Sequence, residues 1–124
     1  MKLSEYFEKT KGYGVLATAD SKGLVDAAIY SKPHFIDEER IAFIMADRLT
    51  HKNLQFNPHA IYLFIESGGG YNGRRLFLTK TDETDDAQVV DSLLRNKEYK
   101  NAAKFVVYFR IDKAIPLIGD GDIL

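Results

Sequence analysis

Hydrophobic and polar residues follow the two-residue period of β-strands along most of the chain. The turn Asp20-Ser-Lys-Gly23 lies between the first two such segments and predicts a β-hairpin. The segment Ala60–Glu66 is apolar on both faces of the predicted strand. We therefore expect both faces to be covered by the barrel interior, a helix or a partner chain. The predicted strands are Tyr13–Ala19, Leu24–Ser31, Ile41–Ala46, Ala60–Glu66, Arg74–Thr81 and Lys104–Asp112.

Helical spacing of apolar residues interrupts this pattern in three places. The first segment predicts a helix over Leu3–Lys11, ended by Gly12. A short polar turn after Ala46 predicts a second helix with Thr50 as its N-cap, which ends at Asn57-Pro58. The segment Thr84-Asp-Asp-Ala predicts the cap of a third helix that runs to about Asn96. The inner face of this helix is Val89, Val90, Leu93 and Leu94.

Six short strands in hairpin-like succession favour a mainly β fold with flanking helices, built as a six-stranded antiparallel barrel that is closed or nearly closed. The helices would cover its ends, and residues 1–124 would form one domain. A doubly wound α/β fold is not expected, because no glycine-rich dinucleotide fingerprint follows the first strand.

Composition narrows the classes of function. The formal net charge is −1, so the chain lacks the basic surface that nucleic acid requires. It has no cysteine, which excludes disulfides, thiolate metal sites and a thiol nucleophile, and its three histidines lack metal-ligand spacing. No apolar run approaches the length of a membrane span or a signal core, so we expect a cytoplasmic protein without a membrane anchor.

The polar start of the second predicted helix is the first candidate binding site. Thr50, His51, Lys52 and Asn53 bring a hydroxyl, an imidazole, an ammonium and an amide to free backbone N–H groups, which suits a phosphate. Taken alone, this stretch is more typical of an ordinary capped helix at the surface.

Small side chains and a pair of arginines add two further candidates. Ala27, Ala28 and Ala46 would let a flat ligand lie close to the strand backbone, although these residues taken alone are more typical of tight barrel packing. Arg74 and Arg75 follow the glycine-rich segment 67–73. One of them could carry its guanidinium inward or toward a partner to stabilise an anionic ring or phosphate, and the alternative is a solvated strand end.

The order of these segments resembles a known family. The pattern is similar to the pyridoxamine 5'-phosphate oxidase-like group of FMN-binding split barrels, and the similarity extends over roughly residues 12 to 112. The segments that carry it are Gly14–Gly23, Val25–Tyr30, Ile41–Ala46, Thr50–Leu54 and Asn57–Leu63.

The resemblance implies a homodimer with two FMN sites at its interface. Thr50-His51-Lys52 matches the family's phosphate-binding Ser-Arg-Lys, with His51 in place of the arginine. The flavin-contacting segments of the family fall at Ala27-Ala28-Ile29 and at Met45-Ala46, and a polar residue of its fifth strand falls at Arg75. The chain has no Trp and lacks the C-terminal Arg, His and Trp that hold the substrate of the oxidase itself, so that activity is not expected.

The leading hypothesis is therefore a dimeric FMN oxidoreductase that passes hydride or electrons between a small donor and a small acceptor. A second hypothesis is a non-catalytic flavin carrier or electron-transfer module. A third keeps the fold with a deazaflavin or haem, for which His51 and His59 would be the candidate axial ligands. A fourth is a dimer that binds no ligand and acts as an interaction scaffold.

Overall fold

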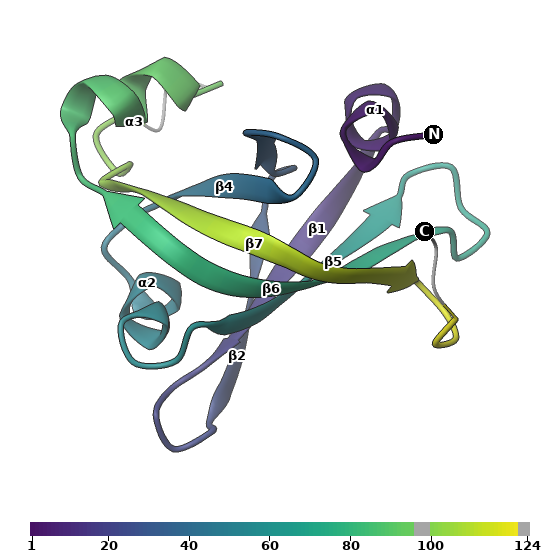
Figure 1. The fold of residues 1–124 in the computed structure, drawn as a ribbon, viewed down its shortest axis with the longest axis horizontal. Coiled ribbons are helices and arrows are strands. Elements are labelled where there is room, and N and C mark those ends of the chain that lie inside the picture. Colours follow the sequence, from purple (N-terminus) through teal and green to yellow (C-terminus); the bar gives the residue numbers. More distant parts are fainter. Residues whose placement is uncertain (96–99, 122–124) are drawn as a thin grey trace.

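One curled antiparallel sheet organises the molecule. The computed structural model describes residues 1–95 and 100–121 of the chain. Within these ranges, seven strands form a sheet in the order β2-β1-β5-β6-β7-β4-β3, with every neighbouring pair antiparallel (Figure 1). The strands are β1 (Gly12–Ala19), β2 (Val25–Tyr30), β3 (His34–Phe35), β4 (Arg40–Met45), β5 (His59–Glu66), β6 (Gly73–Thr84) and β7 (Phe105–Pro116).

The curl brings distant strands of the sheet into contact. Tyr30 of β2 and Phe43 of β4 pack edge to face with ring centroids 5.9 Å apart, although five strand-to-strand steps of the sheet separate β2 from β4. The Tyr62 hydroxyl of β5 donates to the carbonyl oxygens of Tyr30 and Ser31, at 3.2 and 3.1 Å. The predicted mainly β, antiparallel, barrel-like class is thus confirmed.

The predicted number of strands was wrong, because the structure has seven strands where we expected six. The additional strand is β3, whose two residues pair with Ala42 and Ile41 of β4. Two residues are too few to show an alternating pattern, and the neighbouring Pro33 suggested a loop. The pairing is set by the turn, where the Asp37 carboxylate accepts hydrogen bonds from the backbone N–H groups of Glu39 and Arg40.

Alternation along the strands sorts side chains between two sides of the sheet. The concave side holds the main core, whose largest fully buried residues are Tyr62, Phe43, Phe64, Phe109, Leu16, Ile41, Met45, Leu76, Leu78 and Val107. Helix α1 (Leu3–Lys9) adds Leu3, Tyr6 and Phe7 to this core. On the other side of β4 and β7, helix α3 (Ala87–Leu93) packs Val90 with Ala42 and Val106.

The helices differ from the prediction mainly at their ends. Helix α1 stops at Lys9, and Asp86 caps α3 by accepting from the backbone N–H of Gln88. The expected end of α3 near Asn96 lies outside the described residues, and the helix itself ends at Leu93. No helix in the described part of the chain is long and apolar enough to cross a membrane.

The start of the second helix also needs a correction. Helix α2 (Leu49–Leu54) has Arg48 as its N-cap, in extended conformation and without a side-chain cap hydrogen bond. Thr50 is the second residue inside the helix, so its predicted role as N-cap was wrong. Helix α2 has only six residues, so its dipole is a weak basis for anion binding. The side chains around its start are therefore the feature to test for binding.

Gly14 of β1 offers a test of the packing under the sheet. A Cβ atom at Gly14 would collide with the hydroxyl and ring of the buried Tyr62. Gly14→Ala should therefore lower the free energy of unfolding by about 1–3 kcal/mol, the usual cost of overpacking a core. Urea denaturation measures the change. Gly68→Ala is the matched control, since a Cβ there meets nothing within 4 Å, and equal midpoints for the two variants would contradict the packing.

Candidate functional site

A groove of about 780 Å³ lies between β2, the end of β4 and the start of α2. The residues around Arg95 and Ala102 form its remaining wall. Its lining consists of Asp26, Ala28, Ile29, Tyr30, Ser31, His34, Ile44, Ala46, Arg48, Leu49, Thr50, Leu94, Arg95, Ala102 and Ala103.

The floor of the groove follows from strand alternation. In β4, Ile41, Phe43 and Met45 point into the main core, so Ile44 and the following Ala46 face the groove. Ala28 faces them from β2. Alanine side chains project little from the backbone, so this floor leaves room for a flat group to lie against the strands.

The α2 end of the groove carries a cation and two hydroxyls. Arg48 is exposed and forms no ion pair with any residue in the described ranges, while Thr50 is buried. Burial raises the pKa of Tyr30. Tyr30 therefore stays protonated at neutral pH and, with Thr50, can donate a hydrogen bond into the groove.

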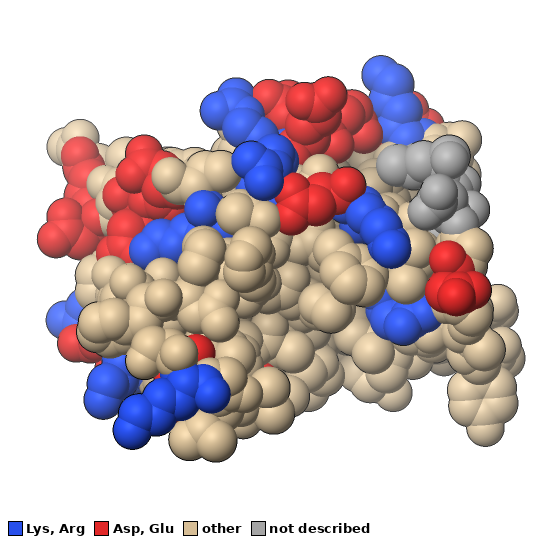
Figure 2. All heavy atoms as spheres, turned by 60° about the horizontal axis from the view of Figure 1, so that its bottom comes forward, with Lys and Arg blue, Asp and Glu red and all other residues tan. Residues whose placement is uncertain are grey.

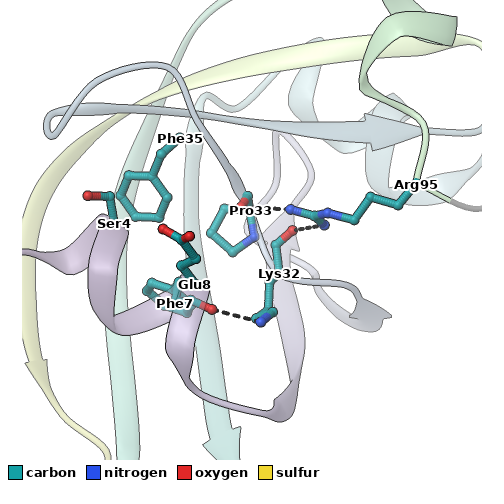
Figure 3. Close-up of a pocket in the computed structure, with 7 residues that line it drawn as sticks. All are labelled: Ser4, Phe7, Glu8, Lys32, Pro33, Phe35 and Arg95. Atoms are coloured by element: carbon teal, nitrogen blue, oxygen red, sulfur yellow. Dashed lines mark hydrogen bonds between the residues drawn. The ribbon is translucent and has the colours of Figure 1, made fainter.

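The opposite end carries a second cation and an imidazole. The two terminal nitrogens of Arg95 donate to the carbonyl oxygens of Lys32 and Pro33, at 2.8 and 3.3 Å (Figure 3). His34 follows directly in the chain. Burial and the charge of Arg95 lower the pKa of His34 to about 4, so its ring is neutral at pH 7.

A smaller pocket of about 360 Å³ lies on the other side of the Lys32-Pro33 segment, and its lining is shown in Figure 3. The Lys32 ammonium donates to the carbonyl oxygens of Phe7 and Thr10 at the end of α1, at 2.7 and 3.1 Å. Arg95 lines both hollows. The segment that separates them is therefore held by α1 on one side and by Arg95 on the other.

The structure brings together four of the ten residues that the sequence predicted for cofactor binding. Ala28, Ile29, Ala46 and Thr50 line the groove. The other six do not line it, and they are Ala27, Met45, His51, Lys52, Asn53 and Arg75.

Each of the six has a different place. Ala27 is exposed on the side of β2 away from Ala28, and Met45 is buried in the main core. Asn53 donates from its amide to the Thr18 hydroxyl at 3.1 Å, and Lys52 is exposed. Arg75 donates to the carbonyl oxygens of Pro116 and Gly119, so it fastens the end of β7 and the residues after it.

His51 differs most from its expected role as a phosphate donor. Its ring is buried, lies stacked on Phe105 at 3.7 Å between centroids, and pairs with the Glu83 carboxylate at 2.9 Å. Gln55 and Lys80 also donate to Glu83. The imidazole therefore fastens α2 to β6 and β7 and does not face the groove.

Sequence reasoning missed the charged residues of the groove. Arg48 is the N-cap of α2, two residues before the predicted N-cap Thr50, so moving the predicted start by two residues would have found it. No local pattern marks His34 or Arg95, which the fold brings to the groove from a two-residue strand and from the residues after α3. In the described ranges, no three His, Asp or Glu side chains gather as a metal site would require.

Comparisons with known proteins support the fold. No family model and no curated protein matches the sequence. An FMN-binding protein from Syntrophomonas wolfei subsp. wolfei matches in structure with a TM-score of 0.80 and 20% identity, over 97% of this chain and 86% of that one. HupZ of Group A Streptococcus matches with a TM-score of 0.74 and 14% identity, over 97% and 94% of the two chains.

A third similar structure is an F420 reductase, with a TM-score of 0.67 and 20% identity over 90% of this chain and 94% of that one. At such identities the similarity shows the fold. The chain has the split-barrel fold that these FMN-binding, F420-reductase and pyridoxamine 5'-phosphate oxidase-like structures share.

The Glu83 network predicts how stability depends on pH. Burial alone would raise the pKa of Glu83, but hydrogen bonds from Gln55, Lys80 and His51 outweigh it and lower the pKa from 4.5 to about 2. The folded state therefore favours the ionised carboxylate, and this stabilisation is complete above about pH 4.5 and is lost as the pH falls toward about 2.

Glu83→Gln should accordingly lower the urea midpoint at pH 7, and its deficit against the unchanged protein should shrink between pH 4.5 and pH 2. Glu39→Gln, at an exposed carboxylate in the β3–β4 turn, is the control. A deficit that stays constant over this pH range would show that ionisation of Glu83 does not stabilise the fold.

Proposed function

We propose that this split-barrel protein binds FMN in the groove between β2 and α2 and, as a homodimer, passes hydride or electrons between a small donor and a small acceptor. One observation carries the proposal: the same groove has a floor of alanine side chains and has Arg48 and Thr50 at one end. The bound flavin would supply the redox chemistry, and the protein would bind and orient it.

The α2 end of the groove suits the phosphate. The Arg48 guanidinium has no ion-pair partner among the described residues, and its planar set of donors matches two phosphate oxygens. The Thr50 hydroxyl lies in the same wall and can donate a further hydrogen bond. Lys52, the cation favoured by the sequence, does not line this wall.

The middle of the groove suits the isoalloxazine ring. Ala28 and Ala46 leave the strand backbone accessible, and Ile44 and Leu49 add apolar surface. A mostly apolar hollow with a few convergent polar groups is the usual form of a cofactor site. The residues present therefore fit a flat, phosphorylated cofactor of the flavin type, and we propose FMN.

The outer side of β1, β2 and β5 supports the homodimer. Val25, Ile29 and Tyr13 are 84%, 72% and 56% exposed, and Ile61 and Leu63 of β5 continue the same side of the sheet. On the side of the molecule that holds β2 and α2 in Figure 1, charged side chains gather at the edges and a broad uncharged area fills the centre (Figure 2). Such an apolar surface is typical of a protein interface.

One observation bears on the haem alternative. His34 lines the groove, whereas neither His51 nor His59, the two ligands considered from the sequence, lines it. A neutral imidazole in a groove is able to ligate iron. An absorption spectrum of the purified protein separates the two, since a flavin spectrum with FMN released on denaturation supports our proposal and a Soret band would replace it with haem binding.

The phosphate assignment predicts a contrast between two cations. Arg48→Ala should weaken FMN binding by about 1.5–3 kcal/mol, the worth of a hydrogen bond to a charged group. It should weaken riboflavin binding much less, because riboflavin lacks the phosphate. Quenching of flavin fluorescence measures both affinities. Lys52→Ala is the matched control. If Lys52→Ala lost FMN affinity and Arg48→Ala did not, the phosphate would bind beside Lys52, as the sequence predicted, and not beside Arg48.

The dimer predicts the effect of a charge on the outer side of the sheet. Leu63→Glu places a carboxylate in the middle of this apolar surface and should convert the dimer to a monomer, because burying an unpaired charge costs several kcal/mol. Sedimentation velocity measures the mass. Gln88→Glu, at an exposed position of α3, is the control. An unchanged protein that sediments as a monomer would disprove the homodimer.

The enzyme and the carrier differ in turnover. Steady oxidation of NADH or NADPH by the FMN-loaded protein, with an acceptor in excess, supports the oxidoreductase. If the bound flavin is reduced once by dithionite and reoxidised without turnover of a nicotinamide donor, the carrier is the better description.

A further inference from the structure

We infer that Arg95 and His34 form a second subsite at the α3 end of the groove, which binds the carboxylate of the small molecule that exchanges electrons with the flavin. This inference rests on the proposed function, because it assigns a substrate class to the same groove. The phosphate of FMN is placed at the opposite end, beside Arg48.

The two residues are held next to each other by the chain itself. Arg95 binds the carbonyl oxygens of Lys32 and Pro33, the two residues before His34. Lys32 is in turn fixed to the end of α1 through the carbonyl oxygens of Phe7 and Thr10 (Figure 3). A binding pair whose backbone is fixed in this way loses little conformational entropy when a ligand arrives.

Strand alternation sets the direction of His34. Phe35 packs against the main core and lines the smaller pocket, so the neighbouring His34 faces the opposite side of β3, where the groove lies. No described residue hydrogen-bonds to its ring. The imidazole therefore has a donor available for a ligand in the groove.

Arg95 also has capacity left. A guanidinium has five N–H donors, and the two hydrogen bonds to Lys32 and Pro33 use two of them. Among the described residues no carboxylate forms an ion pair with Arg95. The remaining donors and the N–H of His34 can converge on one anionic oxygen group.

The charge of this end favours a monoanion. The neutral His34 contributes no charge, so among the described residues that line this end Arg95 supplies the one positive charge. Asp26 is the acidic residue among the described lining of the groove. It lies near the start of β2, on the side of α2 and away from the segment that precedes His34. A carboxylate matches one guanidinium, whereas a phosphate dianion would remain partly uncompensated.

The experiment uses benzoate as the probe and benzamide as its uncharged analogue. On the FMN-loaded protein, benzoate should give a saturable change in the flavin absorption spectrum and bind at least about tenfold more tightly than benzamide, since a charge-assisted hydrogen bond is worth about one factor of ten or more. In the proton NMR spectrum at neutral pH, the ring resonances of His34 should shift with the same dissociation constant.

Variants connect the binding to the two side chains. Arg95→Lys keeps the charge and one donor to the Lys32-Pro33 carbonyl oxygens but loses the planar fork, and His34→Phe removes the N–H. Each should weaken benzoate at least about fivefold, consistent with the loss of one hydrogen bond to a charged group. Arg110→Lys and His59→Gln, at exposed positions away from the groove, are the matched controls. Circular dichroism verifies that each variant is folded.

Four results would overturn the inference. Benzoate and benzamide could bind equally, or both variants could bind benzoate like the unchanged protein. Inorganic phosphate could displace benzoate more effectively than acetate does. Arg95→Lys could abolish the preference for FMN over riboflavin, which would place the flavin phosphate at this end.

The same NMR titration separates this inference from the proposed function. If FMN does not bind at all, the proposed function fails, and the shift of the His34 resonances on adding benzoate to the flavin-free protein still decides whether the subsite exists. If FMN binds and benzoate does not, the subsite alone is wrong.

Discussion

The aromatic contact between β2, β4 and β5 fixes the geometry on which the groove depends. β2 and β4 form two of its walls, yet no hydrogen bond of the sheet joins them. Their separation is set by Tyr30 against Phe43, by Phe43 against Tyr62 at 5.0 Å, and by the Tyr62 hydroxyl, which holds the end of β2. The distance across the groove is therefore determined by the packing of the core, where side-chain volumes are tightly constrained.

Local patterns were sufficient for the parts of the structure that repeat. Six of the seven strands follow from alternation, and Ala28 and Ala46 were found because a small residue within a strand is a local signal. The pattern could not predict which side of each strand would face the groove. Met45 lies between the groove-lining Ile44 and Ala46, and the two-residue period sends it into the core on the opposite side.

Charged residues were harder to place, because their positions depend on contacts between distant segments. His51 and Lys52 lie at a predicted helix start, as a phosphate site would require, but Glu83 and Phe105 draw His51 to the other side of α2. Neither partner is near it in sequence, so no pattern around residue 50 could reveal this. At position 51, where the resemblance led us to expect an arginine, the buried histidine instead contacts the Glu83 carboxylate and so joins α2 to β6.

The same long-range contacts separate the two ends of the groove to which we assign different ligands. Arg48 is positioned by the turn between β4 and α2, while His34 and Arg95 are positioned by the Lys32-Pro33 segment and its anchor on α1. These supports share no residue, so a change at one end need not disturb the other. Arg95 also lines the smaller pocket beside α1. A change that moves α1 would therefore affect the α3 end of the groove directly. It would reach the α2 end only through the packing of the core. Under the proposed function, such an arrangement would let the residues around Arg95 and His34 vary to suit different small molecules without altering the end of the groove that we assign to the cofactor.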